Sequence, residues 1–368
     1  TDVSPTIRSE KMANYKALSK PLDYGKQLPP FLKRTPIKYE QSRDDFETMH
    51  KERFMYDYNK PKKVLEIGSN SGPFIDNFSK VDSICVEPCS NFAEVTEGMG
   101  YKTYIEFWTT ELAKEIVSKD GYMDMIYAAN CMCHIHDLDD AFNAVRELLS
   151  PSGIFVFEDP SLLRILERGS YDQIYDEHPH VFSVIAINNL LRRNGLQIFR
   201  VDNLSVHGGS NRIYACHMDS CMVGDSVRHN INEEMMFGLD QFETYQTFAE
   251  RVKNSKETLV RSLSNLKRNG KEIMCIGATA KSTTVFNYCG IGPDLIDVIT
   301  DTTKAKQGMF SPGVHIPVVP RDSINLNDYD YAYLGAWNFK EVIADKEREF
   351  VQNGGEFITH VPQVMRFS

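Results

Sequence analysis

The feature that most constrains the fold is an alternation of short apolar runs with helical patterns that begins at Lys62. The apolar runs predict β-strands, and the segments between them have the periodicity of helices. Such βαβα alternation is typical of a parallel sheet covered by helices on both faces. The expected strands are Val64–Ile67, Ser83–Val86, Met123–Ala128 and Ile154–Glu158, with helices at about 73–79, 90–98, 109–118 and 138–149.

A second alternating unit begins at Lys271, so we expect an α/β protein with two Rossmann-like domains. The first would be a doubly wound domain over residues 61–220, and the second would cover 271–368. Residues 1–60 form a polar N-terminal segment, and 221–270 are expected to be a helical connector. The other expected elements are a helix at Ala186–Asn194, strands at Leu196–Val201, Arg212–His217, Ile273–Gly277, Leu295–Thr300, Tyr331–Leu334 and Glu356–His360, and helices at about 280–288 and 338–352.

Composition excludes several classes of function. The net charge of −10 and the pI of about 5.5 argue against a surface for duplex nucleic acid, which needs clustered Lys and Arg. No stretch reaches the 18 apolar residues of a membrane span, and the first residues do not resemble a signal peptide. The eight cysteines lie mostly in apolar, strand-like runs, which favours reduced thiols and a cytoplasmic location.

A glycine loop, Glu66-Ile67-Gly68-Ser69-Asn70-Ser71-Gly72, follows the first expected strand. Its glycines would let a ligand approach the backbone closely, and Glu87, at the end of the second strand, could bind both ribose hydroxyls. A dinucleotide site would require a third glycine, so the loop favours S-adenosylmethionine over NAD, with an ordinary βα turn as the alternative. The expected cofactor-binding residues here are Glu66, Gly68, Asn70, Gly72 and Glu87.

The segment Asn130-Cys131-Met132-Cys133-His134-Ile135-His136 follows the third expected strand, where ligands collect in open α/β sheets. Its cysteines and histidines suggest zinc, but alternate side chains of an extended segment point apart and rarely reach one tetrahedral ion together. We therefore predict no metal here. Asn130 is a further candidate for cofactor binding, and His134 is the candidate functional imidazole.

Residues 171–183, Tyr-Asp-Gln-Ile-Tyr-Asp-Glu-His-Pro-His-Val-Phe-Ser, are dense in titratable groups. Burying them is costly unless they serve one another or a ligand. The ordinary pKa of an imidazole, near 6.5, suits His178 to act as a general base. Glu177 could raise its basicity, and Tyr175 could donate to a developing enolate oxygen. The alternative is a polar loop whose histidines have no such role.

Together these motifs resemble the C-methyltransferases that act on nucleotide-linked 4-keto-6-deoxy sugars. The matching segments are LEIGSNSG (65–72), VEP (86–88), Asn130 to His134, YDQIYDEH (171–178), HGGSNR (207–212), NYCGIGPDLID (287–297), KQG (306–308), PGVHIPVV (312–319) and AWN (336–338). The resemblance implies an S-adenosylmethionine-binding central domain and a C-terminal domain that helps to bind the sugar nucleotide.

The resemblance also implies roles for individual residues. His178 would remove the proton from C3, next to the C4 ketone, while Tyr175 and Glu177 hold the sugar and His134 lies nearby. The implied substrate-binding residues are Tyr39, Tyr171, His207, Gly209, Ser210 and Arg212. From the residues alone, His207 to Ser210 could simply be a loop before a strand, and Arg212 a surface charge.

Three departures from the family pattern leave other functions open. Ser71 replaces the usual Asp, no cysteine precedes Cys85 to form the usual four-cysteine zinc module, and the loop Gly277 to Ser282 differs from the usual small-Lys-Gly-Asn form. A zinc module is therefore not expected, unless it lies upstream of this chain. The alternatives are a small-molecule O-methyltransferase and a non-catalytic subunit that binds sugar nucleotides. The sequence predicts neither the oligomeric state nor the nucleotide base.

Overall fold

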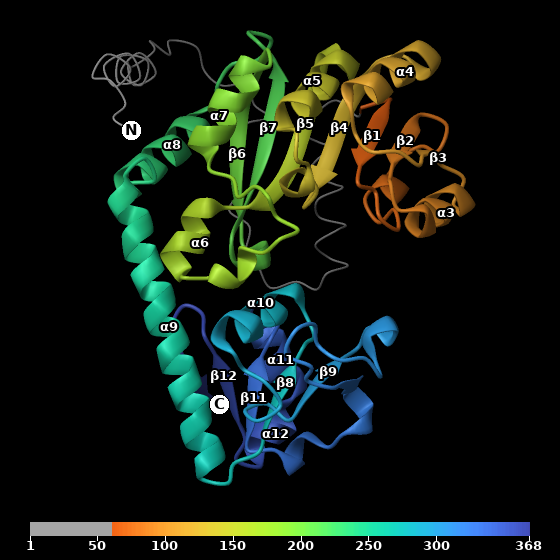
Figure 1. The fold of residues 1–368 in the computed structure, drawn as a ribbon. Helices are drawn as coiled ribbons and strands as arrows, with labels where there is room; N and C mark the ends of the chain where they lie inside the picture. The colour runs from red at the N-terminus through yellow and green to blue at the C-terminus, as the bar shows by residue number, and fades with distance from the viewer. Residues whose placement is uncertain (1–60) are drawn as a thin grey trace.

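The computed structural model describes residues 61–368, which form two α/β units joined by a long helix (Figure 1). One sheet has seven strands in the order β3-β2-β1-β4-β5-β7-β6, and the other has six in the order β10-β9-β8-β11-β12-β13. The expected fold class is therefore confirmed. Tyr39, predicted to bind substrate, lies outside the described residues.

In the first unit, strands β1 to β5 are parallel, and β7 runs antiparallel between β5 and β6. The strands are β1 (Val64–Ile67), β2 (Ser83–Val86), β3 (Lys102–Tyr104), β4 (Met123–Ala129), β5 (Leu149–Pro160), β6 (Leu196–Leu204) and β7 (Ser210–His217). The helices are α3 (Ser90–Gly98), α4 (Thr110–Asp120), α5 (Leu138–Leu148), α6 (Leu162–Arg168) and α7 (Val184–Arg193).

The core of this unit explains why its strands are nearly continuous apolar runs. All four residues of β1 are buried, because helices or loops cover both faces of the sheet. Leu65 and Ile67 pack into one hydrophobic cluster, and Val64 packs into another on the opposite face. Helix starts are defined by side chains that accept from backbone N–H groups: Thr109 for α4, Asp137 for α5 and Ser183 for α7.

The second unit repeats the pattern with a sheet that is parallel except for its last strand. Its strands are β8 (Ile273–Ile276), β9 (Val298–Asp301), β10 (Val318–Pro320), β11 (Tyr331–Leu334), β12 (Glu356–Thr359) and β13 (Met365–Phe367). Its helices are α10 (Ala280–Cys289), α11 (Lys340–Lys346) and α12 (Arg348–Gln352). The end of the sheet that carries α10 faces the first unit (Figure 1).

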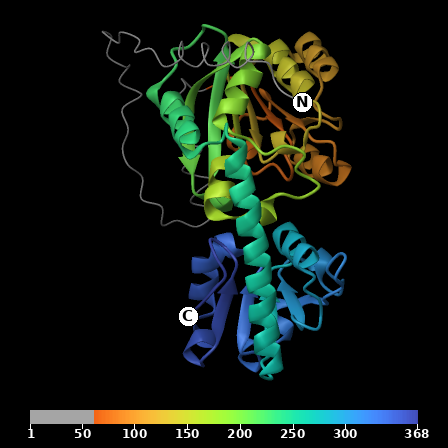
Figure 2. The ribbon, with the colours of Figure 1, turned by 60° about the vertical axis from the view of Figure 1, so that its left-hand side comes forward.

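Helices α8 (Asp225–Phe237) and α9 (Phe242–Arg268) connect the units. The 27 residues of α9 span about 40 Å at 1.5 Å per residue. Figures 1 and 2 show α9 running alongside the second unit, and Leu259 and Leu263 pack into that unit's core. At its other end, Arg251 donates to the carbonyls of Leu166 and Glu167 at the end of α6. The helix thus contacts both units.

Several expected elements differ from the structure. The helix expected at 73–79 is only a 3₁₀ turn, η2 (Ile75–Asn77), in which the Asn77 side chain donates to the carbonyls of Pro73 and Phe74. The helix expected at 338–352 is divided into a 3₁₀ turn, η9 (Trp337–Phe339), α11 and α12. Strands β3, β10 and β13 and helix α6 were not expected, because they are too short to show a clear periodicity.

Within residues 61–368, no helix combines the length and apolar character that crossing a membrane requires.

Candidate active site

The carboxyl ends of β1, β2 and β4 lie side by side at the point where the strand order of the sheet changes direction. From β1 the sheet extends to β2 and β3 on one side and to β4 and β5 on the other. Ligands of open α/β sheets bind at such a point. Gly68 follows β1, Glu87 follows β2 and Asn130 follows β4, so the structure brings these predicted cofactor residues to one edge.

The glycine loop requires its glycines. Gly68 has φ +67°, and a Cβ there would lie 2.8 Å from the Cys131 Sγ. Gly72 has φ +80°. The Glu87 carboxylate accepts from the N–H of Asn70 at 2.8 Å and from the N–H of Cys89 at 2.9 Å. Glu87 therefore stabilises the backbone of the loop from the end of the neighbouring strand.

Two polar groups under the loop bear on what it can bind. Glu66 is buried, its Oε2 accepts from the Ile75 N–H at 3.0 Å, and burial raises its pKa well above the usual range. The side chain therefore holds the backbone of the loop. The Ser69 Oγ is buried and makes no hydrogen bond of normal geometry in the described part of the chain, although the Cys85 thiol approaches it. A buried hydroxyl without a full partner, in a loop whose turns require glycine, fits a polar ligand of the adenosyl type.

The predicted acid–base residues follow a 3₁₀ turn, η4 (Tyr171–Gln173). The His178 Nε2 lies 2.9 Å from the Tyr175 hydroxyl, and its Nδ1 lies 3.2 Å from the Gln173 carbonyl oxygen. Because a carbonyl can only accept, Nδ1 carries the proton, and Nε2 accepts from Tyr175. Burial, and then the charge of His134, lower the pKa of His178. The half-buried ring is thus neutral at neutral pH, with its basic nitrogen at Nε2.

His134 has a matching arrangement. It ends the 3₁₀ turn η3 (Met132–His134), and its Nδ1 lies 2.6 Å from the Glu177 carbonyl oxygen. Its ring meets the His178 ring edge-on, with centroids 4.8 Å apart. The Glu177 side chain is exposed. The structure therefore brings His134, Tyr175 and His178 together, whereas Glu177 contributes its backbone.

The local geometry around Cys133 bears on the metal hypothesis. Potential ligand atoms of Cys133, His134 and His178 all lie within 4.8 Å of one another. The prediction that these side chains would diverge assumed an extended segment, but η3 is a tight turn. His136 and Cys131 are not part of this group. Burial raises the pKa of the Cys133 thiol far above its usual range, so in this structure it is a neutral thiol.

The second unit contributes to the same region. Lys281, in the first turn of α10, is near enough for its charge to act on His178 and His207. Burial, followed by the charges of Lys281 and His178, lowers the pKa of His207 to about 4. Burial also lowers the pKa of Lys281. Lys281 was not among the predicted site residues. Its position shortly after β8, where ligands bind in open α/β sheets, could have indicated a role in binding.

The loop containing His207 and Gly209 is held between the units. His207 has φ +53°. A Cβ on Gly208 would lie 2.3 Å from the Trp337 ring, and one on Gly209 would lie 2.7 Å from the Arg164 side chain. Both glycines therefore permit close packing, which explains the pair without requiring a ligand.

Three predicted substrate-binding side chains are occupied elsewhere. Arg212 is 1% exposed, and its Nε donates to the Glu158 carboxylate at 2.6 Å. Tyr171 is buried in the core of the second unit, with its hydroxyl 3.6 Å from the Cys289 Sγ. Ser210 is buried, and its Oγ donates to the Val206 carbonyl. We do not include these side chains in the proposed site.

Asp159, near the end of β5, is a buried carboxyl that the sequence did not single out. Neither of its oxygens makes a hydrogen bond of normal geometry within residues 61–368, although the thiol and N–H of Cys133 approach it. Burial raises its pKa to about 7. Asp159 is therefore a candidate for titration near neutral pH beside Cys133.

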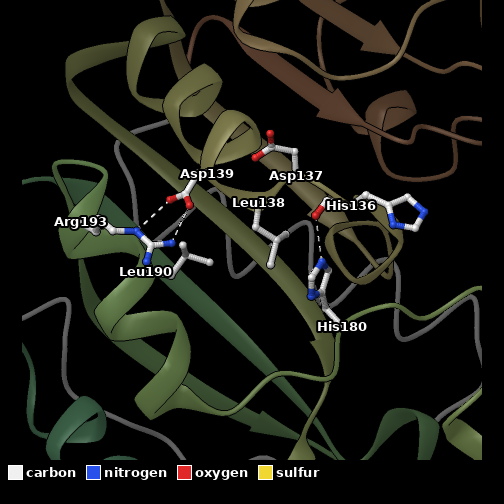
Figure 3. Close-up of a pocket in the computed structure, with 7 residues that line it drawn as sticks. All are labelled: His136, Asp137, Leu138, Asp139, His180, Leu190 and Arg193. Carbon is white, nitrogen blue, oxygen red and sulfur yellow. Dashed lines mark hydrogen bonds and ion pairs between the residues drawn. The ribbon is translucent and has the colours of Figure 1, made fainter. Parts of the chain in front are cut away.

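A surface hollow of about 460 Å³ lies near this region, at the start of α5 (Figure 3). His180 Nε2 faces the His136 carbonyl oxygen at 3.2 Å, and Arg193 pairs with Asp139 at 2.7 Å. None of the predicted site residues lines it, so we distinguish it from the candidate site. Its lining residues are His136, Asp137, Leu138, Asp139, His180, Leu190 and Arg193.

Comparison with known proteins adds independent information. Residues 46–201 match a family described as a methyltransferase domain, and residues 205–362 match one described as a C-methyltransferase C-terminal domain. The C-methyltransferase NovU of Streptomyces niveus is 33% identical over 306 residues, which cover 82% of this chain and 72% of NovU.

Two solved structures are more distant. An S-adenosylmethionine-dependent methyltransferase of Clostridium acetobutylicum is 14% identical, with 47% of this chain and 90% of that chain covered and a TM-score of 0.36. Magnesium protoporphyrin IX methyltransferase of Synechocystis, solved with bound S-adenosylmethionine, is 13% identical, with 47% and 79% covered and a TM-score of 0.35.

Proposed function

This chain belongs to the S-adenosylmethionine-dependent C-methyltransferases, and from that premise we propose that it methylates C3 of a nucleotide-linked 4-keto-6-deoxy sugar, with His178 as the base. The observation that carries the proposal is the pairing of a neutral His178 with Tyr175, against His134 in the turn that follows β4. The linked motifs YDQIYDEH and HGGSNR support the sugar substrate.

The glycine loop would hold the cofactor. Gly68 and Gly72 give the loop its left-handed turns, Glu87 would accept from the ribose hydroxyls, and the Ser69 Oγ would gain a partner. Bound there, S-adenosylmethionine supplies a methyl group on a positively charged sulfur. The protein would contribute by holding the substrate carbon at about 3 Å, the distance from which such a transfer can start.

His178 would create the nucleophile. The C3–H bond is acidic because the C4 ketone can take up the electron pair as an enolate. The proton moves to Nε2. This nitrogen has a free lone pair, because the Gln173 carbonyl keeps the ring proton on Nδ1. The hydroxyl of Tyr175 now donates to Nε2, and it would turn to the enolate oxygen when the sugar is bound. The enolate carbon would then be the nucleophile for the methyl group, whose bond to sulfur breaks with its electron pair left on the sulfur.

Lys281 supports an anionic substrate. It makes no ion pair with any residue between 61 and 368, yet it lies between the units beside His207 and His178. Burial disfavours its charged form and the charge of Asp172 offsets this only in part, so a further nearby anion would stabilise it. We propose that it contacts the diphosphate of the sugar nucleotide.

The experiment that tests the base is the substitution His178→Ala. We expect turnover to fall by at least about 10²-fold, the contribution of one general base, with unchanged cofactor affinity. His180→Ala is the matched control, because it removes a nearby imidazole that, within residues 61–368, contacts the His136 carbonyl and the Phe182 ring rather than His178. Near-normal turnover in His178→Ala would contradict the proposal.

Solvent exchange distinguishes carbon from oxygen methylation. In D₂O without methyl donor, the wild-type protein should exchange the C3 proton of the keto sugar, and His178→Ala should not. Methylation without such exchange in any form of the protein would favour the O-methyltransferase alternative. Failure to bind S-adenosylmethionine in calorimetry would favour the non-catalytic subunit.

A further inference from the structure

We infer that Asp172 and Trp337 form a positioning pair across the two units that determines which ring nitrogen of His178 carries the proton. The inference rests on the proposed role of His178. It concerns residues that do not touch the substrate, and it gives a function to the AWN motif (336–338), which the proposed chemistry leaves unused.

Asp172 crosses from one unit into the other. It lies in η4 of the first unit, is fully buried, and its Oδ2 accepts from the Trp337 Nε1 at 2.6 Å. Its Oδ1 is 3.5 Å from the His360 Nε2, too far for a normal hydrogen bond. A buried carboxylate is costly unless it is bonded, so the short bond to Trp337 is the main contact that fixes it.

Trp337 holds two segments of the first unit together. It begins the turn η9, which follows β11 after Gly335 and Ala336, and is 5% exposed. Its indole N–H binds Asp172, and its ring packs on Gly208, where a Cβ would come within 2.3 Å. The segment with His178 and the loop with His207 therefore share one anchor in the second unit.

Asp172, which Trp337 holds, is the residue directly before Gln173, whose carbonyl orients the His178 ring. The Gln173 carbonyl oxygen accepts from the His178 Nδ1 at 3.2 Å. The Gln173 side chain is also buried, with its Nε2 bonded to Ser170 Oγ at 3.1 Å. The Gln173 peptide is thus held on both sides, and releasing Asp172 would free its carbonyl to turn.

A freed carbonyl would change the tautomer of His178. Without an acceptor at Nδ1, the proton can move to Nε2, where it would donate to the Tyr175 oxygen. A ring protonated at Nε2 cannot remove a proton from C3 with that nitrogen. The competent fraction of the enzyme, and with it kcat, would fall in proportion.

The test measures the tautomer directly. In ¹⁵N-labelled protein, long-range ¹H–¹⁵N spectra distinguish the two neutral forms of a histidine, and the His178 signal is identified by its loss in His178→Gln. We expect Nδ1–H in the wild type and a mixture with Nε2–H in Trp337→Phe and Asp172→Ala. Their kcat should fall about tenfold if the competent form drops to one tenth, while the KM for S-adenosylmethionine stays unchanged.

Two controls separate positioning from general loss of packing. Trp108→Phe removes the other tryptophan of the chain. Trp108 is also 5% exposed, and its indole N–H donates to the Ala141 carbonyl, but it lies far in sequence from residues 171–178. Asp172→Asn keeps an oxygen that can accept from Trp337. Both should retain the wild-type tautomer. If Trp337→Phe does not fold, Asp172→Ala provides the same measurement.

An unchanged His178 tautomer in a folded Trp337→Phe or Asp172→Ala protein overturns the inference. So does an equal shift in Trp108→Phe. The result is independent of the proposed function, because the spectra need no substrate. If the tautomer shifts but His178→Ala retains turnover, the positioning pair stands and the role of His178 as base fails.

Discussion

At the scale of single residues, two imidazoles are each held by a backbone carbonyl. His134 Nδ1 meets the carbonyl of Glu177, and His178 Nδ1 meets that of Gln173. The motif YDQIYDEH predicted the residue types, but not these contacts, because nothing in a local pattern says which carbonyl a ring will face. For the same reason Glu177 was predicted to act through its carboxylate, although the structure uses its backbone.

The first residue-scale prediction concerns the pH dependence of turnover. The neutral form of His178 is the base, so activity is present above its folded pKa and is lost as the pH falls through that value. Since the charge of His134 helps to lower this pKa, His134→Gln should raise it and move the acid limb of the kcat/KM profile to higher pH. His229→Gln, an exposed histidine on α8, is the control. A limb that stays in place or moves to lower pH would contradict the assignment.

The second residue-scale prediction concerns Asp159 and stability. Its folded pKa is raised to about 7 from an ordinary value of 3.8, so between these values the folded state binds a proton that the unfolded state has released. The free energy of unfolding should therefore fall as the pH rises from 4 to 7, by up to about 4 kcal/mol. Asp159→Asn should flatten this dependence and be relatively more stable at pH 8. Denaturant unfolding at several pH values measures it, and parallel curves for both proteins would rule it out.

At the scale of elements, the glycine loop was predicted well and its flanking helix was not. The sequence predicts a strand followed by a turn at Val64–Gly72, because few other local structures fit an apolar run followed by Gly68 and Gly72. The helix expected at 73–79 shrinks to η2, because side-chain hydrogen bonds compete with the helical ones. The antiparallel direction of β7 was also outside the prediction, since strand direction depends on partners distant in sequence.

The prediction at this scale compares two glycines with similar backbones. Gly68 and Gly290 have φ of +67° and +70°, but a Cβ on Gly68 would lie 2.8 Å from Cys131 Sγ, whereas one on Gly290 would meet nothing within 4 Å. Substitution by Ala should cost each about 1–2 kcal/mol of stability through the left-handed backbone. Only Gly68→Ala should also weaken S-adenosylmethionine binding, by about tenfold or more, measured by calorimetry. Equal affinities in the two variants would remove the loop from the cofactor site.

At the scale of the whole molecule, the two units are joined by more than a linker. Tyr171 of the first unit packs in the core of the second, Asp172 bonds Trp337, and α9 contacts both. The sequence predicted two alternating units, because each has its own local periodicity. It could not predict the insertion of residues 171–173, since a contact between distant segments has no repeat along the chain.

We expect the described units to unfold in one transition. The two tryptophans are natural probes, because Trp108 lies in the first unit and Trp337 in the second. In urea, the fluorescence of Trp108→Phe should report only the second unit, and its midpoint should coincide with that of far-ultraviolet circular dichroism. A fluorescence midpoint well below the circular dichroism midpoint would show that the units unfold separately.

The buried carboxylate of Asp172 also limits how such enzymes can be recombined. A chimera that exchanges only the C-terminal half would replace Trp337 but keep Asp172. Its carboxylate would then be buried without the hydrogen bond that Trp337 donates. A chimera that keeps these contacts therefore takes residues 170–174 and the turn at Gly208 from the same parent as the C-terminal half with Trp337. Substrate preference and catalytic competence would then be inherited as one block.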